Sequence, residues 1–452
     1  MNRRHFLTLS SGALVAAETT PPNIVLIFCD DLGYGDLGCY GSKLSTPNLD
    51  RMAAQGVRFT NFYSANPVCS PSRAGLLTGR YPTRVGVPRV FFPADKLGLA
   101  RDERTMADVL KARGYRTMCV GKWHLGHTPE YLPTSRGFDE YFGIPYSNDM
   151  SPRLMLQGTE AVEQTAALET ITPRYTEQAV GFIERNKAKP FFLYMPHTYP
   201  HIPLGASDRF RGKSEHGLYG DVIAELDWSV GEVLACLKRN GLEKNTLVLF
   251  SSDNGPWFQG SPGKLRGRKG QTYEGGVRVP FLARWPGRIP AGRVLDAIGS
   301  TLDLMPTLAK LTGATLPAKP LDGVDIWPLL SGEKKDHSRE ALLYFDNWDL
   351  QCARLGNWKL HVGRYNTFIY GPVPAVGRMN LRLRPAELYN VAADPDESFN
   401  VAAKFPEIVR DLEARIARAL PAFPEEVREA WLQTDSRETA PSEPGRLPRP
   451  KA

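Results

Sequence analysis

Two apolar runs in this chain each end in a pair of side chains that carry hard oxygen ligands. NIVLIF is followed, after one cysteine, by Asp30 and Asp31, and TLVLF is followed, after two serines, by Asp253 and Asn254. Short apolar runs of this kind are typical of strands that are buried on both faces, as in a parallel sheet. This pattern constrains the fold strongly, because a sheet buried on both faces needs helices to cover it.

Two further runs follow the same pattern. RTMCV leads to Lys122 and His124, and FFLYM leads to His197 and His201. Segments of helical length alternate with the runs, each followed by a glycine that we expect to form a left-handed cap, at 47–55, 105–113 and 221–240. The alternation predicts an α/β fold with a largely parallel central sheet flanked by helices. Because ligands bind beyond the carboxyl ends of such strands, we expect the polar groups after the four runs to converge on one site.

From about residue 340 the pattern changes. Short β-like runs at 341–345, 351–355 and 358–362 precede one amphipathic helix at 406–420, which predicts a smaller C-terminal α+β domain with an antiparallel sheet. The last residues are rich in Pro, Ser, Arg and Glu and predict a disordered tail. The expected organisation is an N-terminal extension at 1–21, an α/β domain at 22–338, a C-terminal subdomain at 339–435 and a tail at 436–452.

The composition excludes several classes of protein. With 42% hydrophobic and 23% charged residues over 452 positions, the chain is typical of a globular protein with a large core. The net charge is +7, but Lys and Arg are spread along the chain, so we expect a mixed solvated surface and no nucleic-acid partner. The six cysteines form no close C-x-x-C pair, which argues against a zinc site, a redox motif or a dense disulfide framework.

The N-terminus has the pattern of an export signal. Met-Asn-Arg-Arg-His-Phe-Leu precedes a short stretch of apolar and small residues that ends at Ala17. This is typical of a twin-arginine-type signal, so we expect a periplasmic or secreted protein whose mature form starts near Glu18. A disordered N-terminal extension is the alternative. No later segment approaches the roughly 20 apolar residues that span a bilayer, so we expect no stable membrane insertion.

The most specific segment, CSPSRAGLLTGR, starts at Cys69. It resembles the C-x-P-S-R-x-x-x-L-x-G-R signature of the type I sulfatases, which belong to the alkaline phosphatase superfamily, and every fixed position is filled. The resemblance implies the alkaline-phosphatase-like fold and a cysteine that a separate maturation enzyme oxidises to formylglycine. A free cysteine alone is usually just a small buried hydrophobe, so the interpretation depends on the whole motif.

An aldehyde at residue 69 has a chemical advantage over a serine. Its hydrate carries two hydroxyls, of which one attacks sulfur and becomes a covalent sulfate ester. The second hydroxyl then loses its proton and expels sulfate by C–O cleavage, which regenerates the aldehyde. A serine has no second hydroxyl and therefore lacks this exit.

The resemblance also gives the oxygen-bearing pairs a role. DDLGYGD resembles the family's N-terminal metal motif, and SDNG resembles the second half of that motif. Ligands of this kind, without cysteine or histidine side chains, suit calcium, with magnesium as the alternative, and do not suit zinc. The implied ligands, completed by an oxygen of the residue derived from Cys69 or of the sulfate, are Asp30, Asp31, Asp253 and Asn254.

Basic side chains would surround the sulfate. GKWHLG resembles the family's G-K-W-H-x-G motif, which supplies Lys122 and His124. His124 would take a proton from the diol, because imidazole titrates near neutral pH. Lys122 and Arg73 would neutralise charge around residue 69 and the sulfate. PHIP resembles the family's P-H-x-P segment and implies that His201 faces the sulfate, whereas His197 is a rival whose alternative role is structural.

A third basic segment, LRGRKGQTYEGG, resembles the family's lysine loop. It places Lys269 on the sulfate or on the leaving-group oxygen. Arg268 departs from the family pattern, since many relatives carry a small residue there, and we expect it at the pocket rim, where it would meet further anionic groups of the substrate. In GIPYSND, Ser147 resembles a serine that touches the sulfate, and a plain loop serine is the alternative.

The resemblance covers about residues 22–405 and has most in common with the arylsulfatase A branch. It implies a sulfuric ester hydrolase that cleaves sulfate monoesters of a small molecule or, by analogy, of a saccharide. Two alternatives stay open: a formylglycine-dependent phosphonate monoester or phosphodiester hydrolase of the same superfamily, and a non-catalytic binder of sulfated glycan. Against the binder stands a complete set of implied catalytic residues, Cys69, Arg73, Lys122, His124, His201 and Lys269.

Overall fold

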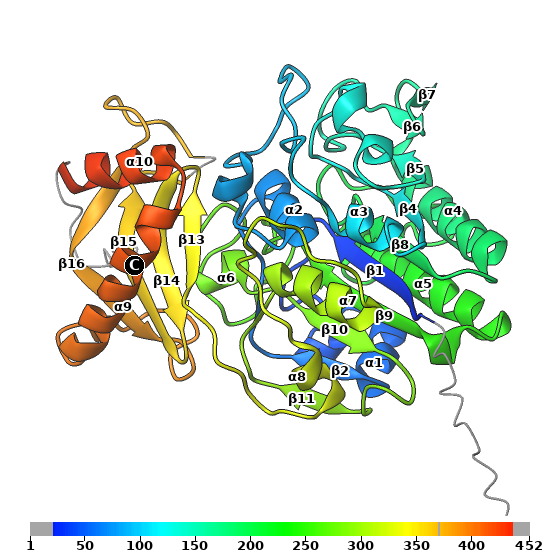
Figure 1. Cartoon of the computed structure of the whole chain (residues 1–452). Coiled ribbons are helices and arrows are strands. Elements are labelled where there is room, and N and C mark those ends of the chain that lie inside the picture. Colours follow the sequence, from blue (N-terminus) through cyan, green and yellow to red (C-terminus); the bar gives the residue numbers. More distant parts are fainter. Residues whose placement is uncertain (1–20, 369–370, 437–452) are drawn as a thin grey trace, which may run out of the picture.

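The computed structural model describes residues 21–368 and 371–436, which form two large β-sheets side by side (Figure 1). The larger sheet has the strand order β11-β2-β10-β9-β1-β8-β4-β5-β6-β7. In that order the strands are Arg293–Leu295, Val57–Phe59, Phe281–Arg284, Thr246–Ser252, Asn23–Cys29, Phe191–Pro196, Arg116–Val120, Glu140–Gly143, Met155–Gln157 and Glu160–Glu163. A short parallel pair joins β3 (Phe62–Tyr63) to β12 (Gly299–Ser300).

The centre of the larger sheet is parallel. Strands β9, β1, β8, β4 and β5 run in one direction, and antiparallel strands flank them on both sides. Ile24 of β1 pairs with Phe192 of β8 and Leu247 of β9, and all of β1 is buried. The predicted α/β fold with a largely parallel sheet is thus confirmed. Because β9, β1, β8 and β4 are neighbours, the polar residues that follow them emerge at one edge of the sheet.

Helices cover both faces of this sheet (Figure 1). Ile24, Leu26 and Phe28 face one core, and the alternate residues Val25 and Ile27 face the other. The helices that pack into the first core are α2 (Cys69–Thr78), α3 (Met106–Lys111), α7 (Leu304–Thr312) and α8 (Trp327–Ser331). Those that pack into the second are α1 (Pro47–Ala54), α4 (Ile171–Asn186) and α5 (Gly217–Arg239). This alternation follows from the period of two in each buried strand.

Two of the three predicted glycine caps are present. Gly114 and Gly241 have φ values of 83° and 70°, as a left-handed cap requires. Gly56 does not have a positive φ, and its role is different. A Cβ at Gly56 would lie 2.1 Å from the carbonyl oxygen of Ala283, so only glycine lets the end of α1 approach β10 this closely.

The smaller sheet is antiparallel, as predicted, with the order β13-β14-β15-β16. Its strands are Leu342–Asp346, Asp349–Leu355, Trp358–Tyr365 and Asn380–Asn390. Helices α9 (Pro406–Ala419) and α10 (Glu425–Ser436) bury Leu412, Ile416 and Val427 in its core. Helix α10 is not predicted from the sequence, because few of its side chains are buried. The predicted division at 338 and 339 falls between α8 and β13 and stays a prediction.

Two predictions concern residues outside the described part of the chain. The export signal falls almost wholly on 1–20, and the tail falls on 437–452 apart from its first residue. Within residues 21–368 and 371–436, every helix is too short or too polar to cross a bilayer.

A buried charged network joins the two sheets. Glu274 begins α6 (Glu274–Val277), beside the larger sheet, and accepts a hydrogen bond of 3.1 Å from Nζ of Lys359 on β15. Glu397, which follows β16, accepts a hydrogen bond of 2.6 Å from the backbone N–H of Glu274 and lies 3.4 Å from the Lys359 ammonium. All three side chains are 0% exposed. Losing one partner would leave an uncompensated charge away from water.

Replacing Lys359 by Met should lower the free energy of unfolding by about 3–5 kcal/mol, because Glu274 and Glu397 would stay buried without the ammonium that they share. Arg278 would remain beside Glu274, and His361 beside Glu397. The matched control is Arg239→Met, which removes an ion pair with Glu184 whose side chains are about half exposed. That control should cost less than about 1 kcal/mol. Urea unfolding followed by circular dichroism measures both variants, and equal costs would contradict a buried network around Lys359.

Candidate active site

The signature segment forms α2, a helix that begins at Cys69. All ten residues of α2 are buried, so it lacks the amphipathic period from which a helix is predicted. The helix ends at Gly79, whose φ of 68° is left-handed. The first turn of α2 carries unpaired backbone N–H groups and the positive end of the helix dipole, which favour an anion beside residue 69.

The thiol of Cys69 faces a carboxylate. Its Sγ lies 3.5 Å from Oδ1 of Asp30. Burial, and then the negative charge of Asp30, raise the pKa of Cys69 to about 12. Cysteines that act as thiolates have a lowered pKa, so this environment does not favour the unmodified sulfur as a nucleophile at neutral pH.

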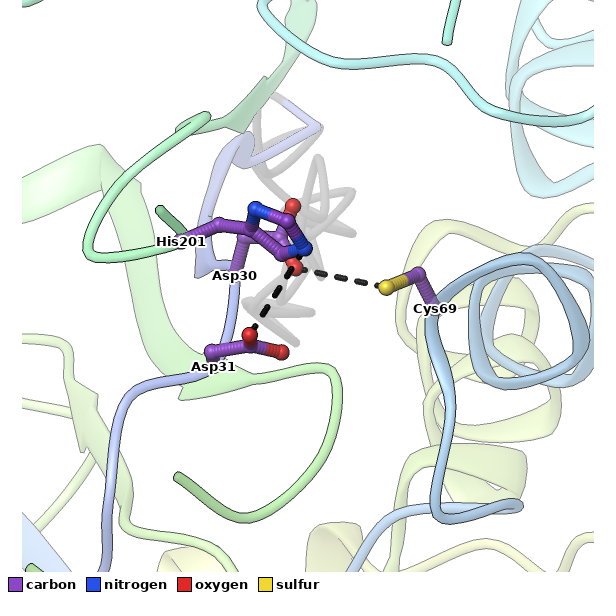
Figure 2. Close-up of side chains that lie close together, drawn as sticks. All are labelled: Asp30, Asp31, Cys69 and His201. Carbon is purple, nitrogen blue, oxygen red and sulfur yellow. Dashed lines mark hydrogen bonds and ion pairs between the residues drawn. The ribbon is translucent and has the colours of Figure 1, made fainter. Parts of the chain in front are cut away.

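Four potential metal ligands point toward one another in Figure 2. Asp30, Asp31, Cys69 and His201 each offer a ligand atom, and these atoms all lie within 4.8 Å of one another. The two aspartates follow β1 directly, and Asp31 has a left-handed φ of 64°. His201 lies in the loop after β8, and its Nε2 is 3.8 Å from Oδ2 of Asp31. The predicted convergence beyond the strand ends is thus present for Asp30, Asp31 and His201.

Asp253 and Asn254, which follow β9, complete the cluster. Asp253 Oδ1 accepts a hydrogen bond of 3.1 Å from the backbone N–H of Asp31, and Nδ2 of Asn254 donates one of 2.8 Å to Oδ1 of Asp31. Oδ1 of Asn254 is buried and has no hydrogen-bond partner among the described residues. A buried unpaired oxygen beside clustered carboxylates fits a hard divalent cation. The donor set therefore suits calcium or magnesium.

Arg73 joins three segments of the site. Its Nε and Nη2 donate to Oδ2 of Asp253 at 3.1 and 2.8 Å, and its Nη1 donates to the carbonyl oxygen of Lys122 at 2.9 Å. The side chains of Arg73 and Asp253 are 0% exposed. Two charge-assisted hydrogen bonds to one carboxylate oxygen fix the position of Asp253 as well as its charge.

Two lysines reach the cluster from other loops. The ammonium of Lys122, in the loop after β4, pairs with Asp30 and donates to Oγ of Ser147 at 3.0 Å. The ammonium of Lys269 donates to Asp31 at 2.9 Å. Three buried cations thus match the three aspartates, so a bound divalent ion would make the site electropositive.

The structure separates the three candidate histidines. Nε2 of His124 lies 2.9 Å from the carbonyl oxygen of Phe91, which can only accept, so this nitrogen carries the proton. Nδ1 of His124 is buried, has no partner in the described part of the chain, and holds the lone pair. Burial, and then the charge of Lys122, lower the pKa of His124 well below its usual value, so the ring is neutral.

His197 has the structural role given as its alternative. Its Nε2 lies 3.5 Å from Oγ of Ser229, its ring packs against Tyr175, and burial lowers its pKa to about 3. It does not belong to the cluster that contains His201.

A cavity of about 400 Å³ lies over the cluster. Five predicted residues line it, namely Cys69, His124, Ser147, His201 and Lys269. These five residues come from separate segments of the chain and share one cavity.

The structure does not place Arg268 at this cavity. Its Nη1 donates to the carbonyl oxygens of Trp257 and Gly260 at 2.9 and 2.7 Å, and its guanidinium lies 5.6 Å from the ring centre of Phe258. The expectation that Arg268 meets substrate at the rim is therefore corrected, because backbone carbonyl groups of the neighbouring loop hold this side chain.

Part of the cavity lining comes from residues that the sequence analysis missed. Asp346 ends β13, Asn347 follows it in the turn to β14, and Arg378 precedes β16, yet all three line the same cavity as Cys69. An Asp-Asn pair is common in the turn between two strands, so no sequence motif indicates that these residues belong to a site. They become recognisable only when the two sheets are placed side by side.

Comparison with known proteins agrees with this arrangement. Residues 22–314 match the family model described as Sulfatase, and residues 268–420 match the model described as N-sulphoglucosamine sulphohydrolase, C-terminal. Human arylsulfatase A is 40% identical, over 91% of this chain and 89% of that protein. The N-acetylgalactosamine-6-sulfatase of Canis lupus familiaris is 42% identical, over 79% of this chain and 75% of that protein.

A solved structure extends the likeness to three dimensions. It comes from work on the metabolism of multiple glycosaminoglycans by Bacteroides thetaiotaomicron and is 33% identical, with a TM-score of 0.80 over 89% of this chain and 99% of that one. The family model alone spans more than half of the chain. The protein is therefore an enzyme of the sulfatase family.

Proposed function

We propose that this sulfatase hydrolyses the sulfate monoester of a saccharide, with the residue derived from Cys69 as the nucleophile. The observation that carries the proposal is the place of Cys69 at the first turn of α2, facing Asp30 in a cavity that Lys269 also lines. A saccharide substrate is supported by the sugar in the name of the N-acetylgalactosamine-6-sulfatase relative.

The cationic groups would bind the anionic end of the substrate. Positive charge beside the cavity comes from the N-terminus of α2 and from the ammonium groups of Lys122 and Lys269. Ser147 Oγ, held by Lys122 at 3.0 Å, adds a hydroxyl that can donate to a sulfate oxygen. Arg73 acts through Asp253 and does not line the cavity, so we assign it the role of fixing α2 and the aspartate in place.

The buried thiol of Cys69 is a poor nucleophile, because its raised pKa keeps it protonated at neutral pH. We propose that a maturation enzyme converts Cys69 to formylglycine, whose hydrate supplies one hydroxyl for attack on sulfur and a second for release of sulfate. His124 is neutral and keeps the lone pair of Nδ1 free, so it can accept the proton of the second hydroxyl. The charge on Lys269 would stabilise the negative charge that develops on the leaving oxygen.

We propose calcium, with magnesium as the alternative, as the bound metal. Asp30, Asp31, Asp253 and the unpaired Oδ1 of Asn254 would hold it, together with an oxygen of residue 69 or of the sulfate. When bound, a divalent cation supplies positive charge that offsets the carboxylates and polarises the substrate oxygens.

We also propose that the protein is exported. The proposal rests on the arginine pair and the following apolar stretch at the N-terminus. Export to the periplasm or out of the cell would bring the enzyme to sulfated saccharides outside the cytoplasm.

The reaction class and the modification are tested together. Protein produced with a maturation enzyme should hydrolyse sulfate esters faster than bis(4-nitrophenyl) phosphate, and peptide mass analysis should show an aldehyde at residue 69. Cys69→Ser should bind the anion without sustained turnover, because it lacks the second hydroxyl. Full activity with only unmodified cysteine would refute the assignment of a modified residue 69 as the nucleophile. Faster turnover of the phosphodiester would favour the phosphoesterase alternative. No turnover of either substrate would favour a non-catalytic binder.

Chelation should remove activity and lower the melting temperature, and calcium should restore both. An ion present at about 100 times its Kd stabilises the folded state by about 2.7 kcal/mol. Asn254→Ala should weaken this stabilisation, because the only neutral oxygen ligand among the proposed side chains is lost. The control is Asp208→Ala, at a carboxylate that is 97% exposed. An unchanged melting temperature in a preparation that elemental analysis shows to be metal-free would overturn the site.

Lys269→Ala should reduce kcat on a small aryl sulfate by about 10²–10³, the usual effect of removing one group that stabilises developing charge. The matched control is the neighbouring Arg268→Ala, which removes a cation whose guanidinium is bound to backbone carbonyl groups. It should leave kcat nearly unchanged. Steady-state kinetics of both variants on 4-nitrophenyl sulfate decide the matter, and the reverse pattern would show that the side chains of this loop are assigned wrongly.

A further inference from the structure

The cavity has a second wall that the chemistry at residue 69 does not use. Asp346, Asn347 and Arg378 line it together with Cys69 and Lys269. Asp346, Asn347 and Arg378 belong to the C-terminal sheet and its loops. Cys69 and Lys269 belong to the part of the chain around the larger sheet. A molecule larger than sulfate, held near Cys69, could therefore contact these three residues within the same cavity.

Asp346 and Arg378 form a tightly held pair. The guanidinium of Arg378 pairs with Oδ2 of Asp346 and lies 3.5 Å from the ring centre of Tyr365. Nδ2 of Asn66, three residues before Cys69, donates to the carbonyl oxygen of Phe345 at 3.1 Å, which ties the end of β13 to the segment that leads into α2. The pair is thus fixed relative to residue 69.

The pair keeps hydrogen-bonding positions that no neighbouring group uses in the part of the chain that the structure describes. A carboxylate has about four lone-pair positions, and Asp346 uses one on Arg378 and one on Nδ2 of Asn347 at 3.3 Å. Nε of Arg378 is buried and has no hydrogen-bond partner within the described ranges. The side chains of Asp346 and Arg378 are 9% and 18% exposed and line the cavity, so a part of each is within reach of a ligand there.

A second cavity, of about 280 Å³, is also lined by this pair. Its lining includes Asp346 and Arg378 together with the polar side chains of Gln351, Tyr365 and Asn366. The pair therefore lines two cavities, and a ligand that extended from one cavity toward the other would lie beside it.

We propose that Asp346 and Arg378 form a subsite for the hydroxyl groups of the sugar ring that carries the sulfate. This inference rests on the proposed function and deepens it. The carboxylate would accept hydrogen bonds from two neighbouring hydroxyls, and the guanidinium would donate to a hydroxyl or ring oxygen. An aryl sulfate offers no donor to Asp346. Sites built around buried polar groups discriminate strongly against ligands that leave those groups unpaired.

The test compares Asp346→Asn and Arg378→Lys with the wild-type enzyme on two kinds of substrate. One is 4-nitrophenyl sulfate, and the other is the best wild-type substrate from a panel of hexose and N-acetylhexosamine monosulfates. The ratio of kcat/KM for the sugar to kcat/KM for the aryl sulfate should fall about 10–100-fold in both variants, since each loses a partner for the sugar. Melting temperatures identify a variant that fails to fold, and the other variant then carries the test.

Arg384→Met is the matched control. Arg384 lies in the same sheet and pairs with Asp435, but both side chains are about half exposed and neither lines the cavity. This variant should leave the ratio unchanged. Equal loss on both kinds of substrate, or no change on either, would overturn the subsite, and so would a wild-type enzyme that hydrolyses the aryl sulfate and none of the sugars. A fully modified, metal-loaded wild type that turns over neither substrate would instead overturn the proposed function.

Discussion

The active site depends on one buried guanidinium. Arg73 lies in α2, whose first residue is Cys69, and it bonds to Asp253 after β9 and to the backbone of Lys122 after β4. Strands β1 and β8 lie between β9 and β4 in the sheet. A single side chain therefore joins α2 to the segments that follow β9 and β4, on either side of β1 and β8. Removing this cation would leave Asp253 buried without its partner, which is far more costly than losing an exposed ion pair.

The charges at the site are arranged for an anion and not for stability. Three buried aspartates beside three buried cations carry a large desolvation cost, and apolar residues of similar size would often be no less stable. The C-terminal sheet contributes to this arrangement from a distance. The backbone carbonyl of Glu397 accepts from Nη1 of Arg266 at 2.8 Å, and its carboxylate accepts from the N–H of Glu274 at 2.6 Å. One residue thus fixes both ends of the loop that carries Lys269.

Much of the fold follows from local patterns. The four apolar runs form adjacent strands of the larger sheet, because their continuous hydrophobicity suits burial on both faces. The hydrophobic pattern does not predict a helix whose side chains are all buried or one with few buried side chains. Helix α2 is buried on all sides and has no amphipathic period, and α10 buries few residues. Gly56 shows a third limit, since a close approach to Ala283 requires the glycine there and not a helix cap.

The sequence by itself determined the chemistry of the site, because the motifs around Cys69, Lys122, His201 and Lys269 fix which side chains follow which strand or loop. The tertiary structure decided which of them share a space. It separated His197 from His201 and bound Arg268 to backbone carbonyl groups. It also placed Asp346 and Arg378, from the second sheet and its loops, in the lining of the cavity that contains Cys69. A motif records neighbours along the chain, whereas a cavity is formed by segments whose relative position depends on the packing of the two sheets.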